Sequence, residues 1–177
     1  MQAANMDQGL LLPTAPMALT PSVPTGFFSG HGFVIHGFGF QFSDGTRTGS
    51  VLEDDLTWVD LMDPIRMPHR ATSWHALALG EFPIAINGFS STIGFLAYCI
   101  EVVTTQKTFP PLCGTETPCR GGPFNFRAPA GFFIKDVRWY RGSPTHVLLA
   151  SMPPLTLGSV APPDIGWVDW RTYGFFN

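Results

Sequence analysis

The chain has 177 residues, a length that suits one domain built around a single hydrophobic core. Hydrophobic residues make up 45% of it and charged residues 13%, with 16 Phe, 19 Gly and 17 Pro, which excludes a disordered chain and favours short strands joined by frequent turns. The net charge of −3 offers no basic surface for phosphates, so the composition argues against a nucleic-acid partner.

Residues 1–24 form a proline-rich N-terminal arm, in which the prolines favour extended chain over packed helix. The apolar run Leu10–Leu19 is shorter than the roughly 20 residues that a membrane span needs. No Lys or Arg precedes this run, which argues against a secretory signal. A disordered tail and an arm that docks through its leucines on the domain or on a partner both remain open.

Residues 25–153 carry the predicted domain. Phe38, Phe40 and Phe42 alternate with small or polar residues, which predicts a strand, and Asp44-Gly45 supplies the following turn. Further strands are predicted over Leu77–Leu79, Ile84–Ile86, Tyr98–Thr104, Phe132–Val137 and Val147–Met152. Such short runs separated by turn residues favour an all-β sandwich, barrel or prism over alternating strands and helices. The segment Glu53–Asp63 fits either a short amphipathic helix or a strand.

Residues 154–177 form a C-terminal arm that is rich in aromatic side chains after the Pro162-Pro163 break. Exposing that much aromatic surface is unfavourable by about 25 cal/mol per Å². We therefore expect this arm to pack on its own domain or on a partner.

Four stretches between Val34 and about Met152 resemble the jacalin-related lectins in order and spacing. They are the hairpin VIHGFGFQFSDGT, the segment HALALGEFPIAINGFSS, the strand IEVVTTQKTF and the segment GGPFNFRAPAGFFI, which ends at Ile134. The resemblance implies an all-β chain folded as a single β-prism, with three antiparallel sheets around one core. It also implies carbohydrate binding without catalysis.

In that family a loop of the form G-x-x-x-D binds sugar, through its aspartate and its backbone N–H groups. The matching positions here are Gly142, Ser143, Pro144, Thr145 and His146. His146 replaces the aspartate, so a bidentate negative acceptor becomes a single neutral nitrogen, and Pro144 removes one backbone donor. Retained sugar binding and a loop that only connects two strands both remain open.

A second part of the candidate carbohydrate-binding rim is formed by Asn87, Gly88, Phe89 and Ser90, which supply an aromatic face and polar groups. Trp139 and Tyr140 could supply further aromatic faces. Because neighbours on a strand point to opposite sides, at least one of these two is expected in the core.

The cysteines Cys113 and Cys119 bracket five residues and form the candidate disulfide, with a chain-entropy stabilisation of about 2.4 kcal/mol. Free thiols and a zinc site are the alternatives, although two cysteines alone are a poor zinc motif. Cys99 lies in a strand and is interpreted as a buried apolar residue. A disulfide would favour an extracellular or other oxidising compartment.

The remaining polar residues supply no catalytic or metal-binding motif. His31, His36, His69 and His75 lack ligand spacing, and the acids between Glu53 and Asp63 lack a calcium-loop pattern. No cofactor fingerprint or nucleophile elbow is present either, so we expect a protein that is not an enzyme and binds neither metal nor cofactor. A hydrolase using Asp54 and Asp55 is the weakest alternative.

Two functional hypotheses follow from the sequence. The first is a lectin-like module that binds glycans and gains strength through an oligomer, because single sugar sites are weak. The second is a structural or assembly subunit that uses the same fold and its terminal arms to contact other protein subunits.

Overall fold

The computed structural model describes residues 22–51, 71–154 and 158–173. The N-terminal arm up to residue 21, the segment Glu53–Asp63 with its two candidate catalytic acids, and His69 lie outside the described residues. Among the residues described, no helix has the length and apolar character needed to cross a membrane.

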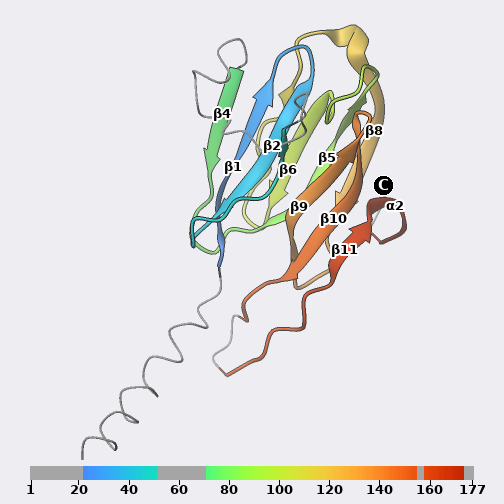
Figure 1. The fold of residues 1–177 in the computed structure, drawn as a ribbon. Helices are drawn as coiled ribbons and strands as arrows, with labels where there is room; N and C mark the ends of the chain where they lie inside the picture. Colours follow the sequence, from blue (N-terminus) through green and yellow to red (C-terminus); the bar gives the residue numbers. More distant parts are fainter. Residues whose placement is uncertain (1–21, 52–70, 155–157, 174–177) are drawn as a thin grey trace, which may run out of the picture.

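The chain folds into three antiparallel sheets (Figure 1), with strand orders β3-β2-β1-β4, β7-β6-β5-β8 and β11-β10-β9. The strands of the first sheet are β1 (Pro24–His31), β2 (Ile35–Phe42), β3 (Ser50–Val51) and β4 (Ala71–Ala76). Those of the second are β5 (Pro83–Ser91), β6 (Cys99–Thr104), β7 (Leu112–Cys113) and β8 (Arg120–Arg127). Those of the third are β9 (Phe132–Tyr140), β10 (Ser143–Ser151) and β11 (Gly166–Asp169). The short helices η2 (Thr117–Cys119) and α2 (Trp170–Tyr173) complete the described elements.

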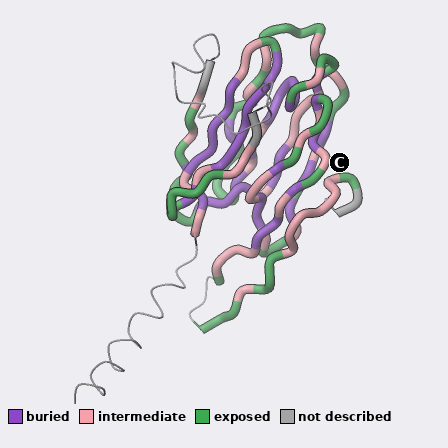
Figure 2. The backbone as a smooth tube through the Cα atoms, in the orientation of Figure 1, coloured by how far each residue is buried: buried purple, intermediate pink, exposed green. Residues whose placement is uncertain are grey.

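The main hydrophobic core lies between the three sheets, and a smaller cluster is formed by Val34, Tyr98 and Cys99. Phe40 from the first sheet, Ile100 and Phe126 from the second, and Ile134 and Leu149 from the third all belong to the main core and are at most 2% exposed. Figure 2 shows the buried backbone along the strands and the exposed backbone mainly in the turns. Three antiparallel sheets around a shared core confirm the β-prism implied by the sequence.

The alternating phenylalanines form β2 as predicted, and Phe38 and Phe40 are buried in the core. Gly45 makes the turn after β2 with a φ of +87°, and its amide donates to the carbonyl of Phe42. The strands predicted near residues 84–86, 98–104, 132–137 and 147–152 are also present, within β5, β6, β9 and β10.

The strand predicted over Leu77–Leu79 is wrong, because β4 ends at Ala76 and the chain turns before β5. The carboxylate of Glu81 organises this turn. It accepts hydrogen bonds from the amide of Ala78 at 2.9 Å and from the hydroxyl of Thr104 at 2.6 Å. These two hydrogen bonds to a buried carboxylate hold the chain in a turn where the sequence predicted a strand.

The part of the C-terminal arm that contains β11 and Trp170 packs onto the domain, which is one of the two outcomes expected from the sequence. Strand β11 pairs with β10 and completes the third sheet (Figure 1), and the ring of Trp170 lies 6.4 Å from that of Phe124. The boundary at residue 153 between domain and arm remains a prediction.

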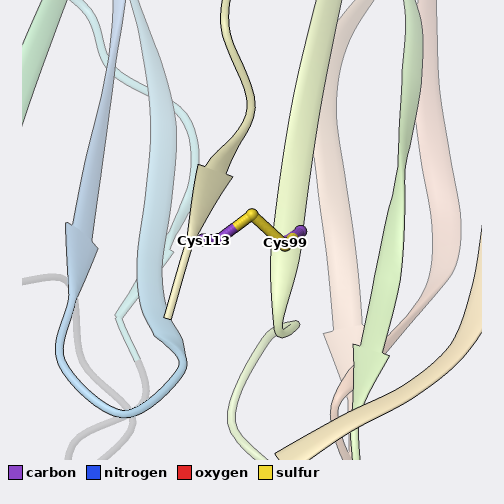
Figure 3. The surroundings of a disulfide bond; sticks show 2 residues. All are labelled: Cys99 and Cys113. Atoms are coloured by element: carbon purple, nitrogen blue, oxygen red, sulfur yellow. A yellow bond between two sulfur atoms is a disulfide. The ribbon is translucent and has the colours of Figure 1, made fainter. Parts of the chain in front are cut away.

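The disulfide joins Cys99 to Cys113, so the predicted Cys113–Cys119 pair is wrong (Figure 3). The reason is strand register: β6 and β7 are antiparallel neighbours, and their pairing sets Cys99 directly opposite Cys113. Cys119 ends helix η2 and is a free thiol. Cys99 is buried, as expected, but as half of a disulfide rather than as an apolar residue.

Candidate functional site

A groove of about 500 Å³ lies over the β7-β6-β5-β8 sheet, on the side turned away from the core. Residues paired across neighbouring strands share a face, so the register sorts the lining into rows. Asn87 of β5 lies between Glu101 of β6 and Asn125 of β8, and these three residues form the polar row.

The next row along the strands is mainly apolar. Phe89 of β5 lies between Cys99 of β6 and Pro123 of β8, and Cys99 is in turn opposite Cys113. The disulfide therefore lines one side of the groove and covalently links β6 to the edge strand β7 beside the aromatic ring.

The polar row offers both donors and acceptors to the groove. The side-chain amide of Asn87 donates to a carboxylate oxygen of Glu101 at 3.3 Å, and all three side chains of the row are half-buried. An amide has two donor hydrogens and an acceptor oxygen, and a carboxylate has two acceptor oxygens, so hydrogen-bonding capacity remains after this contact. The row can thus bind a ligand that carries adjacent hydroxyl groups.

Arg120 lies at the start of β8, next to the apolar row. The central carbon of its guanidinium lies 4.0 Å from the centre of the Phe89 ring, which is a cation–π contact. Arg120 is exposed and also lines the groove. The groove therefore has a cationic and aromatic end and an amide and carboxylate end.

Gly88 is required for packing under this groove. A Cβ added there would lie 1.9 Å from the carbonyl oxygen of Cys99 and 2.8 Å from the ring of Phe124. The backbone of β5 can approach β6 this closely only without a side chain at this position. Of the four predicted rim residues on β5, Asn87, Gly88 and Phe89 line the groove, while the hydroxyl of Ser90 donates to the carbonyl of Gly122 at 3.1 Å.

The other half of the predicted rim, Gly142–His146, is largely strand rather than loop. Gly142 ends the turn between β9 and β10 with a φ of +84°, and Ser143 already begins β10. The amide of Gly142 donates to the carbonyl of Phe95, and its own carbonyl accepts from the amide of Ser91, both at 2.9 Å. These backbone groups are used within the protein.

His146 is exposed on β10, between Arg138 of β9 and Asp169 of β11. Its Nδ1 lies 3.1 Å from the hydroxyl of Thr145. Hydrogen bonds from the backbone and side chain of Arg171, together with the nearby charge of His146, hold the pKa of Asp169 below its usual range. A carboxylate thus lies beside His146, supplied by a strand whose register the sequence does not reveal.

The two predicted parts of the rim, Asn87–Ser90 and Gly142–His146, approach each other only where β5 ends near Gly142. Gly142 contacts Ser91 at the end of β5, whereas Asn87 and His146 lie on different sheets. The sequence-based prediction missed Glu101, Arg120 and Asn125. Alternation was the available signal, since Glu101 lies between the buried Ile100 and Val102.

The expectation for the aromatic pair is confirmed. The ring of Trp139 packs against the core 6.2 Å from Phe38, while Tyr140 is 62% exposed. Across residues 22–51, 71–154 and 158–173, no three side chains of His, Cys, Asp or Glu gather in a way that could hold a metal ion.

No protein-family model matches the chain, and no curated protein matches it either. Similarity to solved structures is found at low identity. Malaysian banana lectin is 14% identical with a TM-score of 0.46, over 75% of this chain and 77% of that one. A mannose binding jacalin related lectin from Ananas comosus is 18% identical with a TM-score of 0.41, over 69% and 79%. Frutalin from Artocarpus incisa, solved with galactose, is 14% identical with a TM-score of 0.42, over 75% and 92%. The three-sheet fold is defined by the strand pairings of this chain and not by its similarity to these lectins.

Proposed function

We propose that the protein is a non-enzymatic carbohydrate-binding module, and that its site is the groove over the β7-β6-β5-β8 sheet. The observation that carries the proposal is the polar row of Glu101, Asn87 and Asn125 next to the ring of Phe89 in one groove of about 500 Å³. Planar amide and carboxylate groups suit adjacent sugar hydroxyls, and an aromatic side chain suits the C–H surface of a sugar ring.

The proposed site includes the Asn87–Phe89 half of the rim expected from the sequence and excludes the Gly142–His146 half. The amide of Gly142 is already bonded to Phe95, and Pro144 has no amide hydrogen to donate. Binding through this segment would need other groups, such as the side chains of Ser143, Thr145 and His146.

A shallow sugar site of this kind is weak alone, so we expect an oligomer or a multi-copy assembly to supply avidity. The Cys99–Cys113 disulfide supports a location in an oxidising compartment, such as the extracellular space.

Saturation-transfer NMR with a panel of neutral oligosaccharides tests the function, and two sets of variants test the site. Asn87→Ala and Glu101→Gln each remove part of the polar row and should weaken binding at least about fivefold, the equivalent of one hydrogen bond of about 1 kcal/mol. His146→Ala and Thr145→Ala serve as controls and should leave binding unchanged. Loss of binding in the control pair alone would assign the site to β10 instead.

An assembly subunit is the second candidate, because one end of the prism carries an apolar patch. Phe33 is 64% exposed, Ile93 50% and Phe95 38%, and all three line a groove of about 350 Å³. Clusters of exposed large apolar side chains favour protein contacts. If this patch joins subunits, Phe33→Ser should lower the molar mass measured by light scattering, whereas an unchanged mass would count against this role.

A further inference from the structure

We infer that the groove prefers acidic glycans, with a sugar carboxylate or sulfate held by the guanidinium of Arg120. The inference rests on the proposed carbohydrate-binding function and adds to it the chemical class of the ligand. It depends on how Arg120 is positioned, on the absence of a carboxylate paired with it among the described residues, and on its separation from Glu101.

Arg120 is oriented before any ligand arrives. Its guanidinium lies over the ring of Phe89 at 4.0 Å, so the side chain is held against a half-buried residue although it is itself exposed. The guanidinium carries N–H donors at its edges, and these can form paired hydrogen bonds with a planar or tetrahedral anion. Less side-chain entropy is lost on binding than for a freely moving arginine.

Among the described residues, no carboxylate forms an ion pair with Arg120, whereas Arg171 pairs with Asp169 at 3.4 Å. Glu101 is the carboxylate that lines the groove, and it accepts a hydrogen bond from Asn87. The positive charge of Arg120 is therefore available to a ligand.

The two charged groups lie at different levels of the groove. Glu101 pairs in register with Asn87, and Arg120 stacks on Phe89, two residues further along β5. Two residues of a strand span about 6.6 Å. A glycan can thus place an acidic group on Arg120 while its neutral hydroxyls meet the polar row, without bringing its negative charge against Glu101.

Isothermal titration calorimetry with matched pairs of probes tests this preference. The carboxylate pair is tetragalacturonate and its neutral methyl ester, and the sulfate pair is a κ-carrageenan tetrasaccharide and its desulfated form. We expect at least one acid to bind about tenfold more tightly than its neutral partner at low salt, with the difference shrinking at 0.5 M NaCl because charges are then screened. The pair that shows the preference identifies the acidic group.

Arg120→Gln should abolish the preference by weakening the binding of the acid, and Arg120→Lys should retain only part of it because lysine lacks the planar fork. The matched control is Arg138→Gln, since Arg138 stacks on Trp167 at the same 4.0 Å distance but on another sheet. It should retain the full preference.

The outcomes separate this inference from the function on which it rests. If the native protein binds the acid and its neutral partner with equal affinity, and Arg120→Gln changes neither affinity, the acidic preference is overturned. Carbohydrate binding itself would remain intact. A preference that is lost equally in Arg138→Gln would also overturn the inference. Absence of binding for all four probes and for the neutral panel would overturn the function itself.

Discussion

The outer faces of the second and third sheets carry the same contact, an arginine stacked on an aromatic ring at 4.0 Å, in different surroundings. On the second sheet Arg120 lies on Phe89 beside a groove, and among the described residues no acid pairs with it. On the third sheet, which we call the balanced face, Arg138 lies on Trp167 and interacts with the charge of Asp136, while Asp169 pairs with Arg171.

The difference between Arg120 and Arg138 teaches that an exposed cation suggests a binding site when no carboxylate of the same protein lies near it. The cations of the balanced face lie near carboxylates of the same protein, and such exposed pairs add at most about 1 kcal/mol to stability. The groove face instead combines amides, one carboxylate and an oriented cation around a hollow.

Among the variants considered, Gly88→Ala should lower the free energy of unfolding most. The added Cβ would lie 1.9 Å from the carbonyl oxygen of Cys99, so β5 and β6 must move apart, at a cost of about 3 kcal/mol in the free energy of unfolding. Urea denaturation measures this cost. Gly122→Ala on β8 is the control, because nothing lies within 4 Å of a Cβ added there. Equal stability of the two variants would contradict the close approach of the strands.

Removal of the disulfide should destabilise the β7-β6-β5-β8 sheet, because the disulfide links its edge strand β7 to β6. Replacing both Cys99 and Cys113 with serine opens a link between residues 14 apart, which is expected to cost about 3 kcal/mol. Thermal unfolding measures the loss. Cys119→Ser should change stability by less than about 0.5 kcal/mol, because Cys119 is a free thiol. Mass spectrometry that finds Cys119 linked and Cys99 free would contradict the pairing.

Asp136 gives the balanced face a distinct pH dependence. Burial raises the pKa of Asp136 from about 3.8 to about 6, and the hydrogen bond from Val137 and the charge of Arg138 offset only part of this effect. The folded state therefore favours the protonated acid, and this contribution to stability is lost as the pH rises through about 6.

Asp136→Asn mimics the protonated acid and can still accept the hydrogen bond from Val137. At pH 8 this variant should be more stable than the native protein by about 2 kcal/mol, and the advantage should disappear near pH 4. Chemical denaturation at both pH values measures the difference. An advantage that is the same at both values would show that the pKa is not raised.

His146→Ala should have the smallest effect. The side chain is exposed and its hydrogen bond to Thr145 joins sequence neighbours, so a change of less than about 0.5 kcal/mol is expected in thermal unfolding. A larger loss would mean that the interaction of His146 with Asp169 supports the third sheet more than a surface contact does.

The sequence predicted the sheet content and much of the core, because side chains such as Phe38 and Phe40 alternate with period two. It also predicted Asn87, Gly88 and Phe89 as rim residues of a carbohydrate site, and these three residues line the groove. It could not predict the pairing of Cys99 with Cys113, because the register of β6 and β7, which are joined by the irregular segment 105–111, is set by tertiary packing.

Unknown strand register also explains why the sequence predicted a sugar-binding loop at Gly142–His146. Position along the chain suggested a binding loop there, but the pairing of β10 with β9 and β11 makes most of this segment part of a sheet. Arg120, Glu101 and Asn125 come from two different strands, and only the folded sheet brings them to one face.

An NMR titration of the ¹⁵N-labelled protein with a neutral oligosaccharide that binds it tests whether the groove over the β7-β6-β5-β8 sheet is the binding site. We predict shifts in the side-chain amides of Asn87 and Asn125 and in the backbone amides around Phe89, with residues 142–146 unchanged. Shifts confined to residues 142–146 and their neighbours on β9 and β11 would contradict the assignment of the site to the groove.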